Sequence, residues 1–356
     1  MAPIPENTIS LHGQLLSPAE LRRRTGRIGQ VAGIESFTYN DGPERGVRAL
    51  RVRTGTGFAF TVLADRGLDI GDAEFRGMAL AWSSPVGVAG PWYYEPEGAG
   101  WLRSFHGGLV ATCGLQHAGR PSERDGNPVG MHGRASNLPA AQITHEAHWN
   151  KAGCTLEVRG QVREASVFGS NLLLTRRITA RIGESGLLIE DTVENQGWSP
   201  APLMLLYHIN LGWPLLSETS RLVGPGAPGE VPEPHDPDVH GVDETWNQFT
   251  PPTLGFTERT CYHDPLADAD GWAEARLENP QLEGGVTLRV RFRPAELPEF
   301  AQWTMTGEGT YVLGLEPATC RLKGYPAERE AGRVIDLQPG ECRRFTLGIA
   351  VESTHR

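Results

Sequence analysis

The sequence predicts an all-β protein built from antiparallel strands. The 44 Gly and 27 Pro residues are spread along all 356 positions instead of gathering in one tract, as expected for many turns between short strands. Most of the strand-like segments alternate apolar with polar residues and end in Gly, Pro, Asn or Asp, which is the pattern of half-buried strands. These segments are residues 47–52, 57–63, 155–162, 171–182, 186–195, 285–292, 310–315 and 344–351.

One short helix is predicted ahead of the strands. Ser17 can cap it, Pro18 suits the first helical position, and Glu20 can return a hydrogen bond to the cap. Three arginines at 22–24 lie toward its C-terminal end, where they complement the helix dipole. Gly26 would close the helix.

No shift in composition marks a linker, so we expect one domain over residues 1–356. Within it, residues 1–44 would form an N-terminal extension that holds the short helix, and residues 45–351 would form the β-structure. Segments 171–182 and 186–195 read as a long hairpin. Residues 224–252 are rich in Pro, Gly, Asp, Glu and His and predict a long loop, which is usually functional or mobile.

Composition excludes several classes of function. The net charge is −10, and no basic run extends beyond three arginines, so nucleic acid is not an expected partner. No stretch approaches the roughly 18 apolar residues of a membrane helix, and the N-terminus lacks a signal sequence, so we expect a cytoplasmic protein without membrane contact. Five widely spaced cysteines without a Cys-x-x-Cys pair indicate free or buried thiols. The oligomeric state is left open.

A histidine and a carboxylate each follow an apolar, strand-like run. His208 comes after residues 202–207, and Glu316 comes after residues 312–315. We expect both to lie where a strand ends and the chain turns, within about 10 Å of each other if they share one substrate. Carboxylates are almost never buried unpaired, so Glu316 needs a partner or a chemical role. His208 by itself fits a satisfied core histidine as well as a catalytic one.

Three further histidines, His106, His117 and His132, each lie close to a glycine. Glycine lets the backbone and a ligand approach closely, which suits a binding cleft, although turns are generally rich in both residue types. Their spacings match no metal-ligand motif, so no metal is expected. Arg66, within Asp-Arg-Gly-Leu-Asp at 65–69, is either a fork that binds substrate oxygens or part of a surface turn held by a local ion pair.

Several of these segments together resemble the aldose 1-epimerase (galactose mutarotase-like) superfamily. Tyr-His-Ile-Asn-Leu-Gly at 207–212 is similar to its general-acid segment, and Gly-Leu-Glu-Pro at 314–317 is similar to its general-base segment. Met-His-Gly-Arg at 131–134 is similar to a segment of the hexose-6-phosphate mutarotases whose His and Arg line the sugar pocket. The resemblance spans roughly residues 45–351. Its nearest branch is the DUF4432 family, through residues 64–70, 105–115 and 132–139.

The resemblance implies a galactose mutarotase-like β-supersandwich with a few short helices, and an isomerase that interconverts the anomers of a free sugar. Glu316 would remove the proton from the C1 hydroxyl while His208 protonates the ring oxygen, so that the ring opens, C1 rotates and the ring closes again. No cofactor or metal is required. The expected substrate-binding residues are His132, Arg134, His106, His117, Arg66, Asn210, Trp213 and Trp303.

Two other functions remain open. A sugar lyase, or an epimerase acting away from C1, would use the same His and Glu, and His106 with His117 would support it. A non-catalytic carbohydrate-binding protein would use His208 and Glu316 only as hydrogen-bonding groups. The sequence does not name the sugar or say whether it is phosphorylated.

Overall fold

The computed structural model describes residues 8–150, 153–236 and 244–353. All pairings between its named strands are antiparallel, and its helices are short, so the predicted all-β class is confirmed. The two α-helices are α1 (Pro18–Arg24) and α2 (Tyr325–Glu330). In α1, the Glu20 amide donates to Ser17 Oγ at 3.2 Å and the Ser17 amide donates to Glu20 Oε2 at 2.8 Å, which confirms the predicted cap.

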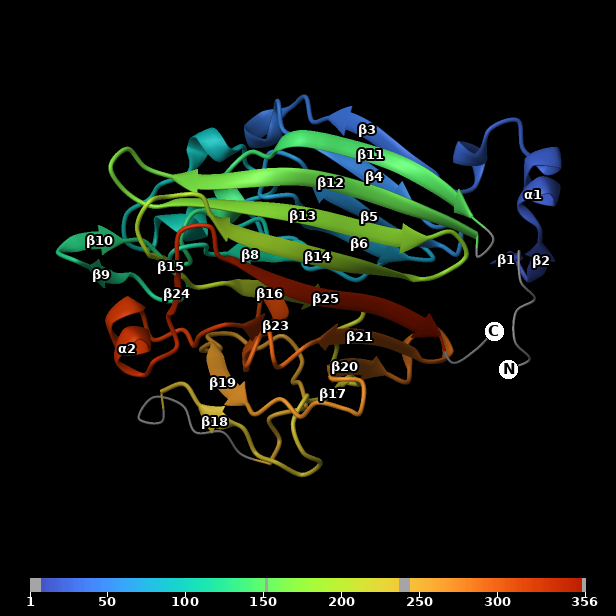
Figure 1. Cartoon of the computed structure of the whole chain (residues 1–356). Coiled ribbons are helices and arrows are strands. Elements are labelled where there is room, and N and C mark those ends of the chain that lie inside the picture. Colours follow the sequence, from blue (N-terminus) through green and yellow to red (C-terminus); the bar gives the residue numbers. More distant parts are fainter. Residues whose placement is uncertain (1–7, 151–152, 237–243, 354–356) are drawn as a thin grey trace.

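The largest sheet has eight strands and curves across the front of the view in Figure 1. Strands such as β14 and β21 alternate buried and half-buried residues because one face packs on the core and the other faces solvent. In spatial order they are β11 (Ala141–Asn150), β12 (Gly153–Ala165), β13 (Asn171–Arg181), β14 (Gly186–Asn195), β25 (Cys342–Ser353), β21 (Val286–Phe292), β20 (Ala273–Asn279) and β17 (Arg221–Val223).

Two further sheets complete the body. The six-stranded sheet has the order β18 (Glu233–Pro234), β19 (Arg259–His263), β22 (Glu299–Gly307), β23 (Thr310–Ala318), β16 (Leu206–Gly212) and β8 (Ala111–Cys113). The five-stranded sheet has the order β3 (Gly33–Thr38), β4 (Arg48–Arg53), β5 (Phe58–Leu63), β6 (Asp69–Phe75) and β7 (Met78–Ala79). Strands β16 and β5 are buried along their whole length because other elements cover both of their faces.

Three two-stranded pairs and six 3-10 turns lie outside these sheets within the described residues. The pairs are β1 (Ile9–Leu11) with β2 (Gln14–Leu16), β9 (Ser122–Arg124) with β10 (Asn127–Val129), and β15 (Ala201–Leu203) with β24 (Ile335–Leu337). The 3-10 turns are Ile28–Gln30, Gly42–Glu44, Pro91–Tyr93, Gly100–Arg103, Ala135–Asn137 and Leu282–Gly284.

All eight predicted strands are present, with ends that move by a few residues. Strand β3 lies within the segment expected as an N-terminal extension, yet it pairs with β4 and so belongs to a sheet. The expected long loop at 224–252 carries the short strand β18, and its residues 237–243 lie outside the described part of the chain.

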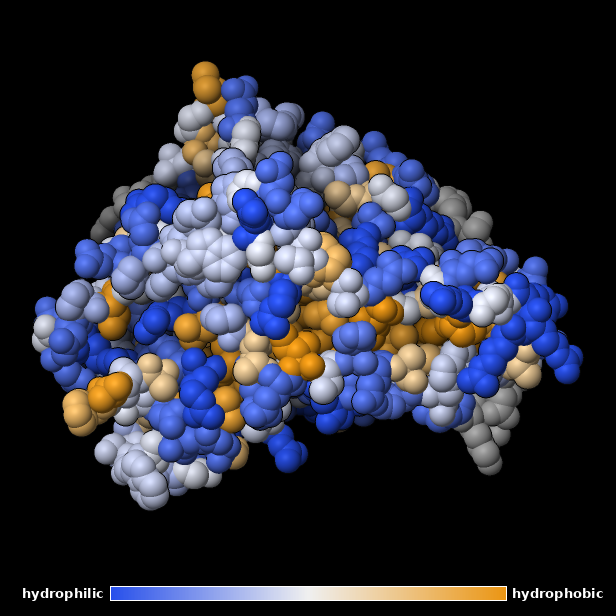
Figure 2. Space-filling model, turned by 90° about the horizontal axis from the view of Figure 1, so that it is seen from above, coloured by the Kyte–Doolittle hydropathy of each residue, from blue (hydrophilic) through white to orange (hydrophobic). Residues whose placement is uncertain are grey.

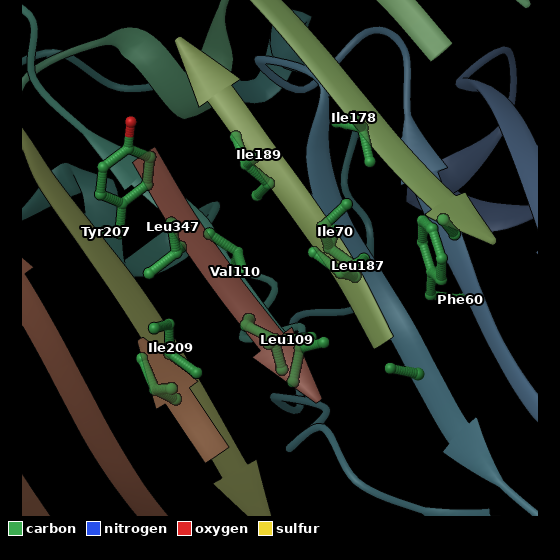
Figure 3. Close-up of a cluster of buried hydrophobic side chains, with 14 of the residues drawn as sticks. Phe60, Ile70, Leu109, Val110, Ile178, Leu187, Ile189, Tyr207, Ile209 and Leu347 are labelled. Atoms are coloured by element: carbon green, nitrogen blue, oxygen red, sulfur yellow. The ribbon is translucent and has the colours of Figure 1, made fainter. Parts of the chain in front are cut away.

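The main core lies between the eight-stranded sheet and the strands behind it. Figure 3 shows Ile189 and Leu347 of the large sheet facing the side of β16 that carries Tyr207 and Ile209. Each such aliphatic side chain stabilises the fold by about 1.5–3 kcal/mol when fully buried. Burial of this inner face leaves the opposite face of β16 available for a site.

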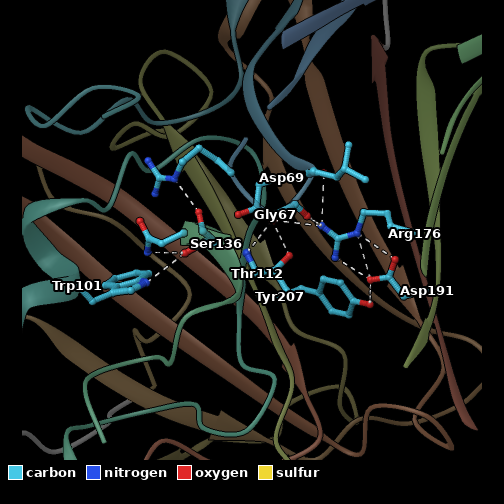
Figure 4. A network of polar contacts seen from close by, with 11 residues as sticks. Gly67, Asp69, Trp101, Thr112, Ser136, Arg176, Asp191 and Tyr207 are labelled. Atoms are coloured by element: carbon cyan, nitrogen blue, oxygen red, sulfur yellow. Dashed lines mark hydrogen bonds and ion pairs between the residues drawn. The ribbon is translucent and has the colours of Figure 1, made fainter. Parts of the chain in front are cut away.

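A cluster of charges is buried within this core (Figure 4). The Arg176 guanidinium contacts Asp191 Oδ2 at 2.7 Å and Asp69 Oδ1 at 3.2 Å, and all three side chains are inaccessible to solvent. Tyr207 donates its hydroxyl proton to Asp191 at 2.6 Å, and Thr112 donates its backbone N–H and its hydroxyl to Asp69. The cluster ties β13 and β14 of the large sheet to β6, β8 and β16.

In the part of the chain that the structure describes, no helix is long and apolar enough to cross a membrane. Figure 2 shows one face of the molecule, where hydrophilic residues surround a narrower band of hydrophobic ones.

Candidate active site

His208 and Glu316 are direct neighbours across two paired strands. The register of β16 with β23 pairs Leu206 with Ala318 and Ile209 with Leu315, which puts His208 opposite Glu316. His208 Nε2 lies 3.3 Å from Glu316 Oε1, and both side chains are almost fully buried. The expected convergence of the two residues is therefore seen. The expected strand ends are wrong, because both strands continue through these positions as central members of the six-stranded sheet.

The pair lies at a cavity of about 410 Å³, called here the central cavity. A cavity of this size can enclose a small molecule such as a monosaccharide. It is lined by Trp82, Ser84, Pro85, Val86, Trp101, Leu102, Phe105, Gly119, Arg120, Met131, His132, His208, His235, Glu258, Thr260, Trp303, Thr310, Glu316 and Leu322.

Aromatic rings form much of the cavity wall. Trp101 stacks on Phe105 with 4.3 Å between ring centroids and lies 4.6 Å from the His132 ring. Trp303 meets the His208 ring edge to face at 5.4 Å. Such faces suit an apolar ligand surface, while the imidazoles and the carboxylate can hydrogen-bond the polar groups of a ligand.

Strand geometry and a glycine bring the Trp303 wall close to the pair. Trp303 pairs with Gly314, two residues before Glu316 on β23, so all three lie on one face of the sheet. A Cβ at Gly314 would lie 2.8 Å from Glu316 Oε1 and 3.1 Å from Trp303 Cβ. The missing side chain therefore makes room for both the carboxylate and the indole.

Burial shifts the pKa values of the pair in opposite directions. It lowers the pKa of His208 to about 4, and it raises the pKa of Glu316 to about 8, with a smaller contribution from the charge of Glu258. Between these two values the pair holds one proton, which burial places on Glu316. Buried atoms His208 Nδ1 and Glu316 Oε2 make no hydrogen bond within the described residues, so both groups have capacity left for a ligand.

His132 lies where the sequence predicted it, at the wall of the central cavity. Its ring is 5.8 Å from the ring of His208, and its Nδ1 accepts a hydrogen bond from the Gly119 amide at 3.4 Å. Desolvation lowers the pKa of His132 well below its usual value, so the imidazole is neutral at physiological pH. Of the other expected binding residues, Trp303 also lines the cavity.

Arg66 was expected either to bind substrate oxygens or to lie in a surface turn, and both expectations are wrong. Arg66 is fully buried, and it donates to three backbone carbonyls, those of Ser136 at 2.6 Å, Ala89 at 2.5 Å and Ser104 at 2.7 Å. It is therefore neither a ligand-binding fork nor part of a surface turn. It joins three chain segments behind the cavity, because loop carbonyls buried away from water need a donor.

Asn210, Trp213 and Arg134 do not line the central cavity either. The Asn210 amide donates to the carbonyls of Gly107 and Gly108 at 3.1 Å and of His208 at 3.0 Å, so it supports the turn next to the pair. Trp213 follows the end of β16 and is 72% exposed. Arg134 is exposed to solvent. The expectation that these three residues contact the substrate directly is not met by their positions.

His106 and His117 are buried behind the cavity and are not among its lining residues. Burial lowers the pKa of His117 to about 4 and that of His106 well below its usual value, so both rings are neutral. His117 Nε2 donates to the Arg120 carbonyl at 2.9 Å. Neither ring nitrogen of His106 has a hydrogen-bond partner in the described ranges. His117 thus contributes to the cavity indirectly, because it holds the backbone of Arg120, which lines the cavity.

Several lining residues were missed by sequence reasoning. Trp101 and Phe105 lie within Trp-Leu-Arg-Ser-Phe-His at 101–106, and this density of aromatic residues beside His106 was the available signal. Arg120, His235 and Glu258 come from separate segments that meet only in the folded chain. Among the described residues, no group of three or more His, Cys, Asp or Glu side chains is arranged to hold a metal ion.

Solved structures show which class of protein has this fold. A "putative aldose 1-epimerase" from Klebsiella pneumoniae is similar with a TM-score of 0.81 and 27% identity, over 90% of this chain and 83% of that one. Galactose 1-epimerase from Lactobacillus acidophilus is similar with a TM-score of 0.58 and 14% identity, over 91% of this chain and 100% of that one. This chain has the galactose mutarotase-like fold.

The particular family is shown by its family model. The model described as "Domain of unknown function (DUF4432)" matches residues 44–351, so the chain belongs to the DUF4432 family. No curated protein matches the sequence. The resemblance to the aldose 1-epimerase superfamily, with DUF4432 as the nearest branch, is therefore confirmed.

Proposed function

We propose that this protein interconverts the anomers of a free sugar by acid/base ring opening. The observation that carries the proposal is the contact of 3.3 Å between His208 Nε2 and Glu316 Oε1 at the wall of an aromatic cavity. The reaction needs one proton donor and one proton acceptor within reach of the same ring. The pair supplies both, because it holds one proton between pH values of about 4 and about 8.

The two groups exchange roles during the reaction. In ring opening, the base takes the proton from the C1 hydroxyl, a carbonyl forms at C1, the bond from C1 to the ring oxygen breaks, and the acid gives its proton to that oxygen. In ring closure on the other face, each group reverses its transfer. Glu316 and His208 therefore each act once as base and once as acid in a cycle. The shared proton can start on Glu316 or on His208. In either case one group is ready to act as the acid and the other as the base in ring opening.

The other lining residues support this assignment by position. Trp303 and Trp101 offer flat faces to the sugar, and the neutral imidazole of His132 can donate to or accept from a hydroxyl. The lyase or epimerase alternative loses the support expected from His106 and His117, because neither ring lines the cavity. A purely sugar-binding role does not require a histidine and a carboxylate that share one proton.

The test is anomer exchange measured by saturation-transfer or exchange NMR on the purified protein, across a panel of free aldoses. We expect faster exchange between the two anomers of at least one sugar, in proportion to protein concentration. Exchange unchanged for every sugar in the panel would contradict the proposal. Cleavage of a glycoside or a keto-sugar by the same preparation would instead favour the lyase alternative.

A further inference from the structure

Arg120 brings a positive charge to the wall of the central cavity without a carboxylate partner. Its side chain is exposed yet lines the cavity, so it lies at the opening. Its only side-chain hydrogen bond in the described ranges is from Nη2 to the neutral His235 ring, at 2.8 Å. Many other guanidinium groups in the described residues pair with carboxylates. Arg321, for example, contacts Glu233 at 2.7 Å and Glu299 at 2.8 Å.

The backbone of Arg120 is fixed by two hydrogen bonds and by the close packing of the residue before it. Its amide donates to the Leu322 carbonyl at 3.0 Å, and its carbonyl accepts from His117 Nε2 at 2.9 Å. The preceding Gly119 has a φ of +95°, and a Cβ there would lie 2.6 Å from the Leu322 carbonyl oxygen. This close approach needs glycine. Because Gly119 also contacts His132, the segment that carries Arg120 is tied to the catalytic side of the cavity.

His235 is held so that its ring accepts from Arg120. His235 Nδ1 bonds the Tyr262 hydroxyl, and that hydroxyl also accepts from the Leu322 amide at 3.2 Å. With Nδ1 as the donor, Nε2 is free to accept from the guanidinium. Burial, followed by the charges of Arg120 and Lys323, lowers the pKa of His235, which favours this neutral form. The imidazole thus orients Arg120 without neutralising it.

The carboxylate of Glu258, which also lines the cavity, is engaged elsewhere. Glu258 Oε2 accepts from Trp303 Nε1 at 2.7 Å, on the wall that carries the aromatic ring. Within the described residues, Arg120 forms no ion pair with it or with any other carboxylate. The remaining guanidinium N–H groups of Arg120 are therefore available to a ligand in the cavity.

We propose that Arg120, oriented by His235, is an anion subsite, and that the substrate is a free sugar with an anionic group remote from its anomeric carbon. The proposal rests on the anomer exchange proposed above, which places C1 at His208 and Glu316. A planar guanidinium with free N–H groups matches a carboxylate or a phosphate bidentately. A neutral sugar could accept hydrogen bonds from this group, but it would gain no charge-assisted contact there.

The test compares kcat/KM for anomer exchange of matched sugars: glucose, glucuronate and glucose 6-phosphate. We expect one anionic sugar to be preferred over glucose. The better of the two identifies whether the group is a carboxylate or a phosphate. Arg120→Gln should lower the ratio of kcat/KM for the anionic sugar to that for glucose by about 10- to 100-fold, the usual loss for a hydrogen bond to a charged group. Arg120→Lys should restore part of that ratio, because it keeps the charge and loses the fork.

Arg259→Gln is the matched control. Arg259 lies on β19 near this region and undergoes the same change of charge, but it does not line the central cavity. It should leave the ratio unchanged. Added salt should raise KM for the anionic sugar more than for glucose, because the Arg120 charge is exposed to screening.

The outcomes separate the two proposals. If glucose is exchanged as well as the charged sugars and Arg120→Gln leaves the ratio unchanged, the anion subsite is wrong while anomer exchange stands. If no sugar is exchanged, the proposed function is wrong, and the subsite is judged by calorimetric binding of glucuronate and glucose 6-phosphate. Binding that is lost in Arg120→Gln would then support it, and absence of binding to the unmodified protein would overturn it.

Discussion

Tyr207 and His208 are consecutive residues of β16 that enter two different polar clusters. Tyr207 faces the core, where its hydroxyl completes the cluster of Arg176, Asp191 and Asp69. His208 faces the central cavity and contacts Glu316. Both clusters are buried. In the first, Arg176 contacts both carboxylates, and Asp69 Oδ2 is the one atom of the three charged groups without a hydrogen-bond partner among the described residues. In the second, a nitrogen of the ring and an oxygen of the carboxylate both lack such a partner there.

The difference shows how one strand serves both structure and chemistry. A buried cluster whose members are paired joins the sheets and leaves little capacity for a ligand. A buried pair with unsatisfied atoms costs stability and keeps both groups able to bind and to transfer protons. Substitutions in the two clusters should therefore separate stability from activity, and the four predictions below test that separation.

The largest expected effect is on stability. Arg176→Met removes the cation that contacts both Asp191 and Asp69 and leaves two carboxylates buried, so it should lower the free energy of unfolding by about 3–5 kcal/mol. Arg177→Met is the matched control on the same strand, because the Arg177 side chain is 38% exposed and its buried partner Glu157 keeps a second cation, Arg159. It should cost about 1 kcal/mol or less. Urea unfolding of both variants measures the two values, and equal losses would contradict the comparison.

Substitutions of His208 and Glu316 should lower activity more than stability. Glu316→Gln and His208→Asn should each lower the rate of anomer exchange by about 10²-fold or more, because each removes a proton-transfer group. Binding should fall less than turnover, since amides keep hydrogen-bonding capacity at both positions. Glu308→Gln, an exposed carboxylate in the turn between β22 and β23, is the control and should keep full activity. Full activity in Glu316→Gln would rule out the proposed roles.

The pH dependence of exchange should follow the single proton of the pair. Above a pH of about 8 the pair loses that proton, no acid remains, and the rate should fall about tenfold per pH unit. Below about 4 both groups are protonated and no base remains.

The acid limb overlaps with a loss of stability. The buried neutral histidines His117 and His263 have depressed pKa values, so their contribution to stability is present above about 6.5 and is lost as the pH falls toward 4. The alkaline limb is therefore the one to measure, and a rate that stays constant up to pH 10 would be inconsistent with Glu316.

The smallest expected effect comes from Tyr207→Phe. This change removes one hydrogen bond to Asp191, while the contacts of Asp191 with Arg176 remain. The free energy of unfolding should therefore fall by about 1–2 kcal/mol. The rate of exchange at a temperature where the variant is folded should stay close to that of the unmodified protein. A large loss of rate at unchanged stability would mean that the core cluster tunes His208 through β16, contrary to the separation drawn here.

Much of the fold could be predicted because strand patterns and the helix cap are local. Strand β11 was missed for a physical reason: it lies at the edge of its sheet and is mostly exposed, so its residues carry no apolar alternation. The strand ends expected at His208 and Glu316 were wrong because central strands are buried on both faces. Pairing between them extends past the point where the apolar run stops.

For the site, the sequence by itself determined the candidate residues. His208 and Glu316 follow apolar runs and suggest an acid/base pair, and His132 stands in a segment similar to one that lines a sugar pocket. Only the tertiary structure decided what surrounds them. Arg66 and Asn210 bind carbonyls of segments remote in sequence, and Arg120 reaches the cavity through contacts with residues 235 and 322. The shared proton was decided there too, because the pKa values of the pair depend on burial, and burial is a property of the folded chain.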